Sequence, residues 1–133
     1  MVKSVRRAVI LTPLGFYVFF WGAPFGVTPT FGAEPSHLNR IIEWRRCPNC
    51  DLSGANLTGA NLKNVYLNGS NFSGANLSGA DLSGAWLEGV DLSGTDLSNA
   101  NLQGALIKGA NLGGAKLCKT TMPSGQIDNS GCR

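Results

Sequence analysis

The sequence has few of the side chains on which most enzymes depend. Its 133 residues include a single histidine, and only 14% of them are charged. One histidine excludes sites built from several, and the sequence contains no Ser-His-Asp set and no recognised phosphate-binding glycine loop. We therefore interpret His37 as a surface or capping residue. The chain is predicted to be non-enzymatic, with no cofactor and no metal.

An excess of positive charge is also missing once the N-terminus is set aside. The whole chain has a formal charge of +3, but Lys3, Arg6 and Arg7 lie in the first seven residues. Without them, eight basic residues (11 − 3) balance eight acidic ones. A neutral chain lacks the basic surface that nucleic-acid binding requires, so nucleic acid is not a predicted partner.

The most prominent feature present is a five-residue period that runs through residues 50–119 without interruption. An apolar residue, usually leucine, stands at the centre of each of the fourteen units, and a smaller residue usually stands two places earlier. The unit reads Ala-Asn-Leu-Ser-Gly, as at residues 75–79. A fixed short period predicts a repeat architecture.

The period favours short extended segments over helices. Glycine occurs in almost every unit, and it costs a helix about 1 kcal/mol relative to alanine. Side chains two places apart share one face of a strand, so the leucine and the small residue can both point inward. The following glycine can make a corner because it tolerates positive φ. We therefore predict an all-β solenoid.

With these units the sequence resembles the pentapeptide-repeat family over residues 50–119. The resemblance implies a right-handed, four-sided β-helix with twenty residues per coil, so the seventy residues would form about 3.5 coils. It also implies that the Asn or Asp before each leucine faces outward. The whole arrangement resembles exported cyanobacterial members of the family, which implies a location in the periplasm or the thylakoid lumen.

Four units depart from Asn or Asp at the outward position, namely those of Tyr66, Trp86, Leu106 and Lys116. The first three lie twenty residues apart, so the implied geometry stacks them in one column. Two interpretations compete. The three side chains pack on one another and stiffen that face, or they form an interaction stripe for another protein, a second copy or a membrane surface.

Residues 1–33 are predicted to be a secretory signal peptide. Three basic residues precede an uncharged apolar stretch, which is the order found in such signals. The alternative is an uncleaved membrane anchor, since the stretch is long enough to span a bilayer, although prolines interrupt it. Contact with a membrane is therefore expected only during export or through an uncleaved signal.

The flanks of the repeat are predicted to cover its ends, where a solenoid exposes backbone and apolar surface. Residues 34–49 would form a capping helix, from Pro35 to Trp44, and a junction. Leu38, Ile41 and Ile42 share one face of that helix and would cover the first coil. Residues 120–133 would form a C-terminal capping loop, because the tail abandons the period and contains proline and glycine.

The four cysteines lie at or beyond the ends of the repeat and fit an oxidising compartment. They are Cys47, Cys50, Cys118 and Cys132. Three pairings are open, and proximity favours Cys47–Cys50 and Cys118–Cys132 as disulfides. A redox-active dithiol at Cys47 and Cys50 would normally follow a strand and precede a helix, the reverse of the order expected here. A zinc site of all four thiols would need cysteines from opposite ends of the solenoid.

Together these features predict an exported structural or protein-interaction module with an unidentified protein partner. A thiol-disulfide redox protein that uses Cys47 and Cys50 is the first alternative. The second is a DNA mimic that binds DNA gyrase, as some family members do. Mimicry needs an acidic rod, whereas residues 50–119 carry five acidic and four basic side chains, a net charge of −1.

Overall fold

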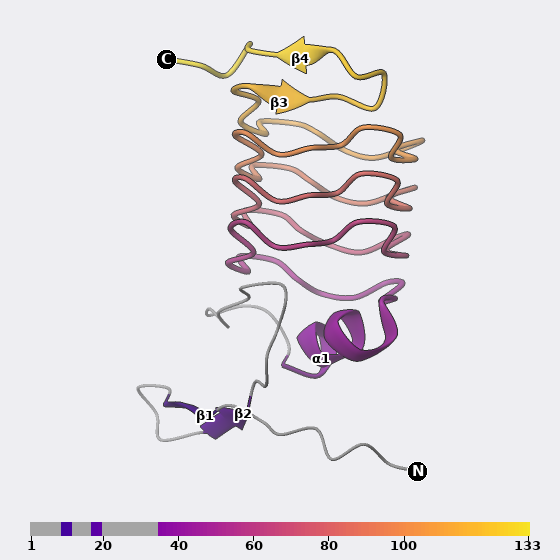
Figure 1. The fold of residues 1–133 in the computed structure, drawn as a ribbon, viewed down its shortest axis with the longest axis vertical. Coiled ribbons are helices and arrows are strands. Elements are labelled where there is room, and N and C mark those ends of the chain that lie inside the picture. Colours follow the sequence, from indigo (N-terminus) through magenta and orange to yellow (C-terminus); the bar gives the residue numbers. More distant parts are fainter. Residues whose placement is uncertain (1–8, 12–16, 20–34) are drawn as a thin grey trace.

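The computed structural model describes residues 9–11, 17–19 and 35–133 of the chain. Two short strands, β1 (Val9–Leu11) and β2 (Tyr17–Phe19), pair in antiparallel fashion. The rest of the predicted signal peptide, residues 1–33, lies outside the described residues. Residues 35–133 form a stack of coils that follows the helix α1 (Pro35–Trp44) and ends in the strands β3 (Thr120–Thr121) and β4 (Ile127–Asp128), as Figure 1 shows.

The coils repeat every twenty residues. Parallel bridges join residues twenty positions apart, beginning with Arg46 and Tyr66 and ending with Asn101 and Thr121. In a typical unit the N–H of Leu52 donates to the C=O of Asn71, at 2.8 Å. Each coil is thus bonded to its neighbours at equivalent positions, so residues i, i+20 and i+40 form columns along the axis. The predicted length of the coil is confirmed.

The ladder of hydrogen bonds between coils extends by one unit beyond each end of the predicted range, residues 50–119. Before it, the N–H of Cys47 donates to the C=O of Tyr66 at 2.8 Å, and Cys47 occupies a leucine position. After it, Thr120, Thr121 and Met122 continue the register, and the N–H of Leu102 donates to the C=O of Thr121 at 2.8 Å. These two units lack the usual Asn and Leu, so they cannot be recognised from the sequence period.

Each unit turns a corner after its central apolar residue. The N–H of Ala55 donates to the C=O of Leu52 at 3.1 Å and closes a β-turn in which Gly54 has a φ of 64°. Positive φ at the third residue of a turn is the type II pattern and favours glycine. Asn64 and Asn99 take this place with φ of 58° and 59°, which asparagine tolerates better than most residues.

Two side chains from each unit fill the interior. The central apolar residues from Leu52 to Leu102 are at most 1% exposed. The residue two places before each of them is also buried, and where it is polar its hydroxyl bonds the backbone. Thr95 donates to the C=O of Phe72 at 2.8 Å, and Ser70 donates to the C=O of Cys47 at 2.6 Å. Polar groups are therefore tolerated in this narrow core because each one has a partner.

Helix α1 packs against the end of the solenoid from which the repeat starts. Its Leu38 and Ile41 are 1% exposed and belong to the same apolar cluster as the coils. The helix covers the range that the sequence predicts, and the spacing of these residues places them on one face. Within the described residues, no helix has the length and apolar character needed to cross a membrane.

The C-terminal tail is a hairpin, whereas the sequence predicts a loop folded over the last coil. β3 and β4 pair in antiparallel fashion, with Thr121 opposite Ile127. The tail, residues 120–133, has fourteen residues, fewer than one coil, and part of it doubles back on itself. It therefore leaves the interior residues of the last coil partly exposed, namely Ile107, Leu112, Ala115 and Leu117.

The difference between the middle and the end of the core leads to a prediction. Leu82→Ala should lower the free energy of unfolding by about 2–5 kcal/mol, because it removes buried atoms and leaves a cavity between two coils. The matched change Leu112→Ala should cost less, since Leu112 is only partly buried. Urea unfolding followed by circular dichroism measures both. Equal losses for the two variants would contradict the open end.

Candidate interaction surface

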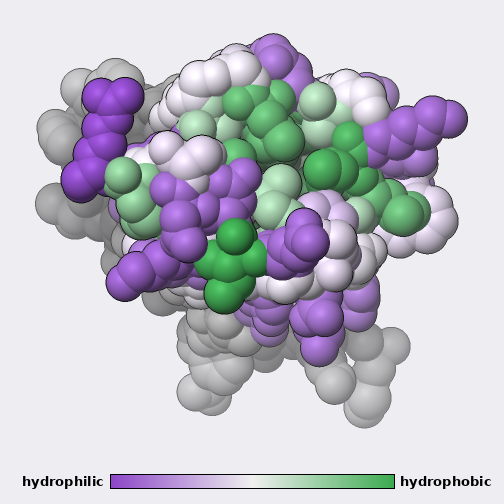
Figure 2. All heavy atoms as spheres, turned by 90° about the horizontal axis from the view of Figure 1, so that it is seen from above, coloured by the Kyte–Doolittle hydropathy of each residue, from purple (hydrophilic) through white to green (hydrophobic). Residues whose placement is uncertain are grey.

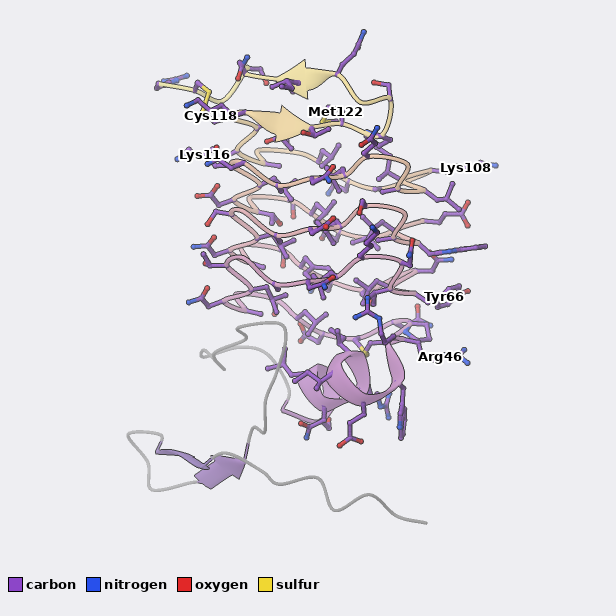
Figure 3. All side chains as sticks on the ribbon, viewed as in Figure 1. Arg46, Tyr66, Lys108, Lys116, Cys118 and Met122 are labelled. Atoms are coloured by element: carbon purple, nitrogen blue, oxygen red, sulfur yellow. A yellow bond between two sulfur atoms is a disulfide. The ribbon has the colours of Figure 1, made fainter. Side chains whose placement is uncertain are left out.

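One outer column of the solenoid is apolar along most of its length. Tyr66, Trp86 and Leu106 are joined by successive bridges, so the predicted stripe forms a continuous column. They are 36%, 46% and 43% exposed. Arg46 begins the same column through its bridge to Tyr66, and Figure 3 shows Arg46, Tyr66 and Lys108 along one side of the coils. Sequence reasoning omitted Arg46, although it stands twenty residues before Tyr66.

The side chains of this column pack on each other. The ring centroids of Tyr66 and Trp86 lie 5.7 Å apart, with an angle of 39° between the ring planes. On the other side, Cζ of Arg46 lies 5.7 Å from the centroid of the Tyr66 ring. Both distances suit attractive aromatic and cation–π contacts. The column therefore supports neighbouring coils while still presenting apolar surface to solvent.

The column beside the stripe is polar and carries both signs of charge. Asn68 Oδ1 accepts a hydrogen bond from the N–H of Glu88 at 2.9 Å, which fixes two successive coils. Lys108 follows in the same column and is exposed. An apolar stripe with a mixed polar border is the usual composition of a protein-protein interface.

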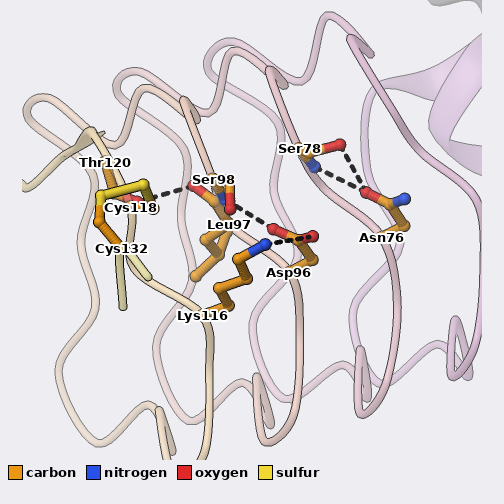
Figure 4. Close-up of polar contacts among 9 residues, drawn as sticks. All are labelled: Asn76, Ser78, Asp96, Leu97, Ser98, Lys116, Cys118, Thr120 and Cys132. Carbon is orange, nitrogen blue, oxygen red and sulfur yellow. Dashed lines mark hydrogen bonds and ion pairs between the residues drawn. A yellow bond between two sulfur atoms is a disulfide. The ribbon is translucent and has the colours of Figure 1, made fainter. Parts of the chain in front are cut away.

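On the other faces, the outward Asn and Asp side chains take part in the turns that follow them. Asn76 Oδ1 accepts hydrogen bonds from the N–H and the hydroxyl of Ser78, at 3.0 and 2.7 Å. Asp96 Oδ1 accepts from the N–H of Ser98 at 2.9 Å, and Lys116 lies 3.9 Å from its other oxygen (Figure 4). Turns of this kind explain the preference for Asn and Asp without any ligand.

These turns lower the pKa values of the aspartates. Hydrogen bonds from the side chain and backbone of Ser53 lower the pKa of Asp51, and those from Ser93 do the same for Asp91. At Asp81 desolvation by burial raises the pKa, but the hydrogen bonds from its serine outweigh that effect and the pKa is lowered. The carboxylates thus stay ionised, which is the opposite of what a general acid requires.

The single histidine also has a structural role. Nδ1 of His37 accepts a hydrogen bond from the N–H of Asp51 at 3.0 Å and so ties α1 to the first coil. This contact agrees with the interpretation of His37 as a surface or capping residue. In the part of the chain that the structure describes, no three His, Cys, Asp or Glu residues are grouped in a way that could hold a metal ion.

Both disulfides join the cysteines that are close in sequence, Cys47 with Cys50 and Cys118 with Cys132. Cys47 and Cys50 are 0% and 1% exposed, because they fill the leucine position of one unit and the small-residue position of the next. Thiol-disulfide exchange needs access to a sulfur. The burial of this pair therefore argues against a redox centre. Cys132, shown in Figure 4, is exposed.

The comparison with protein families decides the identity of the repeat. The sequence profile described as Pentapeptide repeats matches residues 50–89 and 87–122. The chain belongs to the pentapeptide repeat family. The solenoid is accordingly a right-handed β-helix, as the resemblance implied. The second matched segment ends at Met122, one residue before Pro123, whose C=O accepts the last hydrogen bond of the observed register.

Several solved structures are similar to this chain. HetL, a pentapeptide repeat protein involved in the regulation of heterocyst differentiation in the cyanobacterium Nostoc, is 35% identical over 62% of this chain and 43% of its own, with a TM-score of 0.38. A pentapeptide repeat protein from the thylakoid lumen of Arabidopsis thaliana is 32% identical over 51% of this chain and 58% of its own, with a TM-score of 0.32.

Another pentapeptide repeat protein of Nostoc is 36% identical over 69% of this chain and 86% of its own, with a TM-score of 0.36. The present chain spans less than two thirds of the length of HetL and of the Arabidopsis protein. No curated protein matches the sequence significantly.

The hydrogen-bonded aspartates predict how stability depends on pH. Because their pKa values in the folded state are lowered, they contribute stability above the unfolded pKa, and this stability is lost as pH falls through the folded values. The contribution of these aspartates to the free energy of unfolding should be constant near neutrality and decline below about pH 4. Urea unfolding at a series of pH values measures this.

The variant Asp96→Asn, which keeps the acceptor but cannot titrate, should show a smaller loss in acid than the wild type. An identical acid profile in the two proteins would show that the turn at Asp96 contributes nothing to the pH dependence.

The unequal exposure of the two disulfides predicts an order of reduction. A soluble dithiol should reduce Cys118–Cys132 well before Cys47–Cys50, because Cys132 is exposed whereas both sulfurs of the other pair are buried. Brief reduction, alkylation and peptide mass spectrometry identify the labelled cysteines. Early labelling of Cys47 or Cys50 would restore the redox interpretation.

Proposed function

We propose that this chain is a non-enzymatic scaffold that binds another protein through the column of Tyr66, Trp86 and Leu106. One observation carries this proposal. Three consecutive coils place a large apolar side chain where most units have Asn or Asp, and each stays more than a third exposed. If these side chains served only to stiffen the face, they would be expected to be buried. Their exposed surface therefore supports a role in binding a partner.

The border of the stripe favours a protein over a membrane. Glu88 and Lys108 give the neighbouring column opposite charges, whereas a surface that binds anionic lipids is predominantly basic. The stripe is also narrow, with one residue per coil, and so suits an extended segment or the edge of another domain. Such small interfaces are typical of transient complexes.

The proposal includes stable ends and export. Helix α1 and the C-terminal hairpin act as caps, and the hairpin leaves part of the last coil open. The basic and apolar order of residues 1–33 supports removal of a signal peptide during export to the periplasm or the thylakoid lumen. Two disulfides support an oxidising compartment.

A capture experiment with a matched control tests the stripe. Wild-type protein, Trp86→Asn and Trp44→Asn are used as baits in an extract of the exporting host, followed by mass spectrometry. Trp44 is an exposed tryptophan of α1 that lies outside the column. A partner should be captured by the wild type and the control and lost with Trp86→Asn.

Trp86→Asn should stay folded, since a cross-strand pair contributes about 0.2–1 kcal/mol, and circular dichroism checks this. If the folded Trp86→Asn variant captures the same proteins as the wild type, the column serves only to support the coils and the proposal is wrong.

A further inference from the structure

The end of the solenoid beside the C-terminal hairpin has an apolar centre that residues 120–133 leave partly exposed. In the coils before it, the central residues Leu92, Leu97 and Leu102 are at most 1% exposed. In the last coil Ile107 and Leu112 are partly exposed. Figure 2, which views the molecule from this end, shows apolar residues gathered in the middle and hydrophilic residues around them.

The backbone of the same coil is left open as well. One coil earlier, Leu87 and Leu92 donate their N–H groups to the C=O groups of Leu106 and Asn111, both at 2.8 Å. The equivalent donors in the last coil are the N–H groups of Ile107, Gly109, Leu112 and Gly114. In the part of the chain that the structure describes, these groups have no acceptor.

The acceptors of this edge are open in the same way. In earlier coils, the C=O groups of Ala85 and Val90 accept from the N–H groups of Leu106 and Asn111, both at 2.9 Å. Within residues 35–133, the corresponding C=O groups of the last coil accept no hydrogen bond, and they belong to Ala105, Ala110 and Ala115. Open acceptors and donors thus follow one another along two sides of the last coil and the corner between them, and such an edge can pair with another chain.

The charge around this end is positive. Residues 105–133 contain four basic side chains and one acidic one, a net charge of +3 (4 − 1). The basic ones are all exposed, namely Lys108, Lys116, Lys119 and Arg133, and the acidic one is Asp128. Lys116 already pairs with Asp96 at 3.9 Å, but the exposed pair is weak and open to exchange.

We propose that this end is a docking site for an acidic peptide segment of another protein, which adds a further partial coil to the open edge. The segment would bend with the β-turn from Ile107 to Ala110, exchange backbone hydrogen bonds with residues on both sides of that corner, place an apolar side chain over Ile107 and Leu112, and be attracted by the lysines. This site adjoins the stripe at Leu106 and Lys108, but it uses the open backbone edge instead of the outer apolar face.

The structure disfavours the other occupants. A second copy would bring two basic ends together, and at the opposite end α1 covers the apolar core, so head-to-tail stacking would bury little apolar surface. A lipid surface would match the charge but would leave the open N–H and C=O groups without partners at an apolar boundary, which is costly. A peptide strand satisfies the charges, the apolar centre and the backbone together.

The test uses a fluorescent peptide of about ten residues with capped termini, in which glutamate and valine alternate on each side of a central Asn-Gly that can take the corner. Fluorescence anisotropy measures its binding to the wild-type chain. Two control peptides carry either lysine in place of glutamate or N-methyl groups on alternate amides, which block strand pairing. Both should bind at least about tenfold more weakly than the acidic peptide.

Variants locate the site. The double change Lys108→Glu and Lys116→Glu should weaken binding by about tenfold or more, since it reverses two charges at the edge. Lys63→Glu, a charge reversal of an exposed lysine in an early unit, should leave binding unchanged, and so should Trp86→Asn. Failure of the stripe experiment and failure of this one are therefore distinguishable.

Hydrogen exchange gives an independent readout, because the amides of Ile107, Gly109, Leu112 and Gly114 should gain protection when the acidic peptide binds. The proposal is overturned if the N-methylated or basic peptide binds as well as the acidic one, or if none binds. Preferred binding to vesicles of phosphatidylglycerol, or a dimer held through this end in sedimentation experiments, would also overturn it.

Discussion

Each coil of this β-helix can satisfy its backbone only through the coils on either side. The N–H of one coil donates to a C=O nineteen residues further along, as from Leu52 to Asn71, so no coil is stable by itself. This requirement fixes the twenty-residue register, the inward leucines and the glycine corners together. It also makes the two ends the places where the architecture needs separate solutions.

The two ends are treated differently. At the first, an amphipathic helix lays Leu38 and Ile41 on the core, and His37 binds the N–H of Asp51, a group at the start of the ladder. At the second, the tail pairs with itself and is held by a disulfide, so half of the last coil stays open. Lysines at an open edge also discourage pairing between copies of the chain, which agrees with an edge reserved for a partner of opposite charge.

Much of this arrangement can be predicted from the sequence, because the outer columns follow directly from the period. Tyr66, Trp86 and Leu106 stand twenty residues apart, and the structure stacks them in one column. The period fails where a unit loses its usual residues. Cys47 and Met122 occupy the central position of units that lack the usual Asn and Leu. The ladder of hydrogen bonds therefore extends further than the repeat that the sequence shows. The path of a fourteen-residue tail depends on contacts with the last coil, and no local pattern encodes it.

The outward positions separate structural from functional side chains. An Asn or Asp there binds the turn that follows it, as Asp96 does with Ser98, and this local hydrogen bond is enough to explain its presence. Tyr66, Trp86 and Leu106 give up that bond in three successive coils. The mutual packing of two rings and one arginine recovers part of the lost stability, but Leu106 stands beyond the rings and still replaces a polar residue. The proposed partner, lying along three coils, would account for an apolar residue at this position.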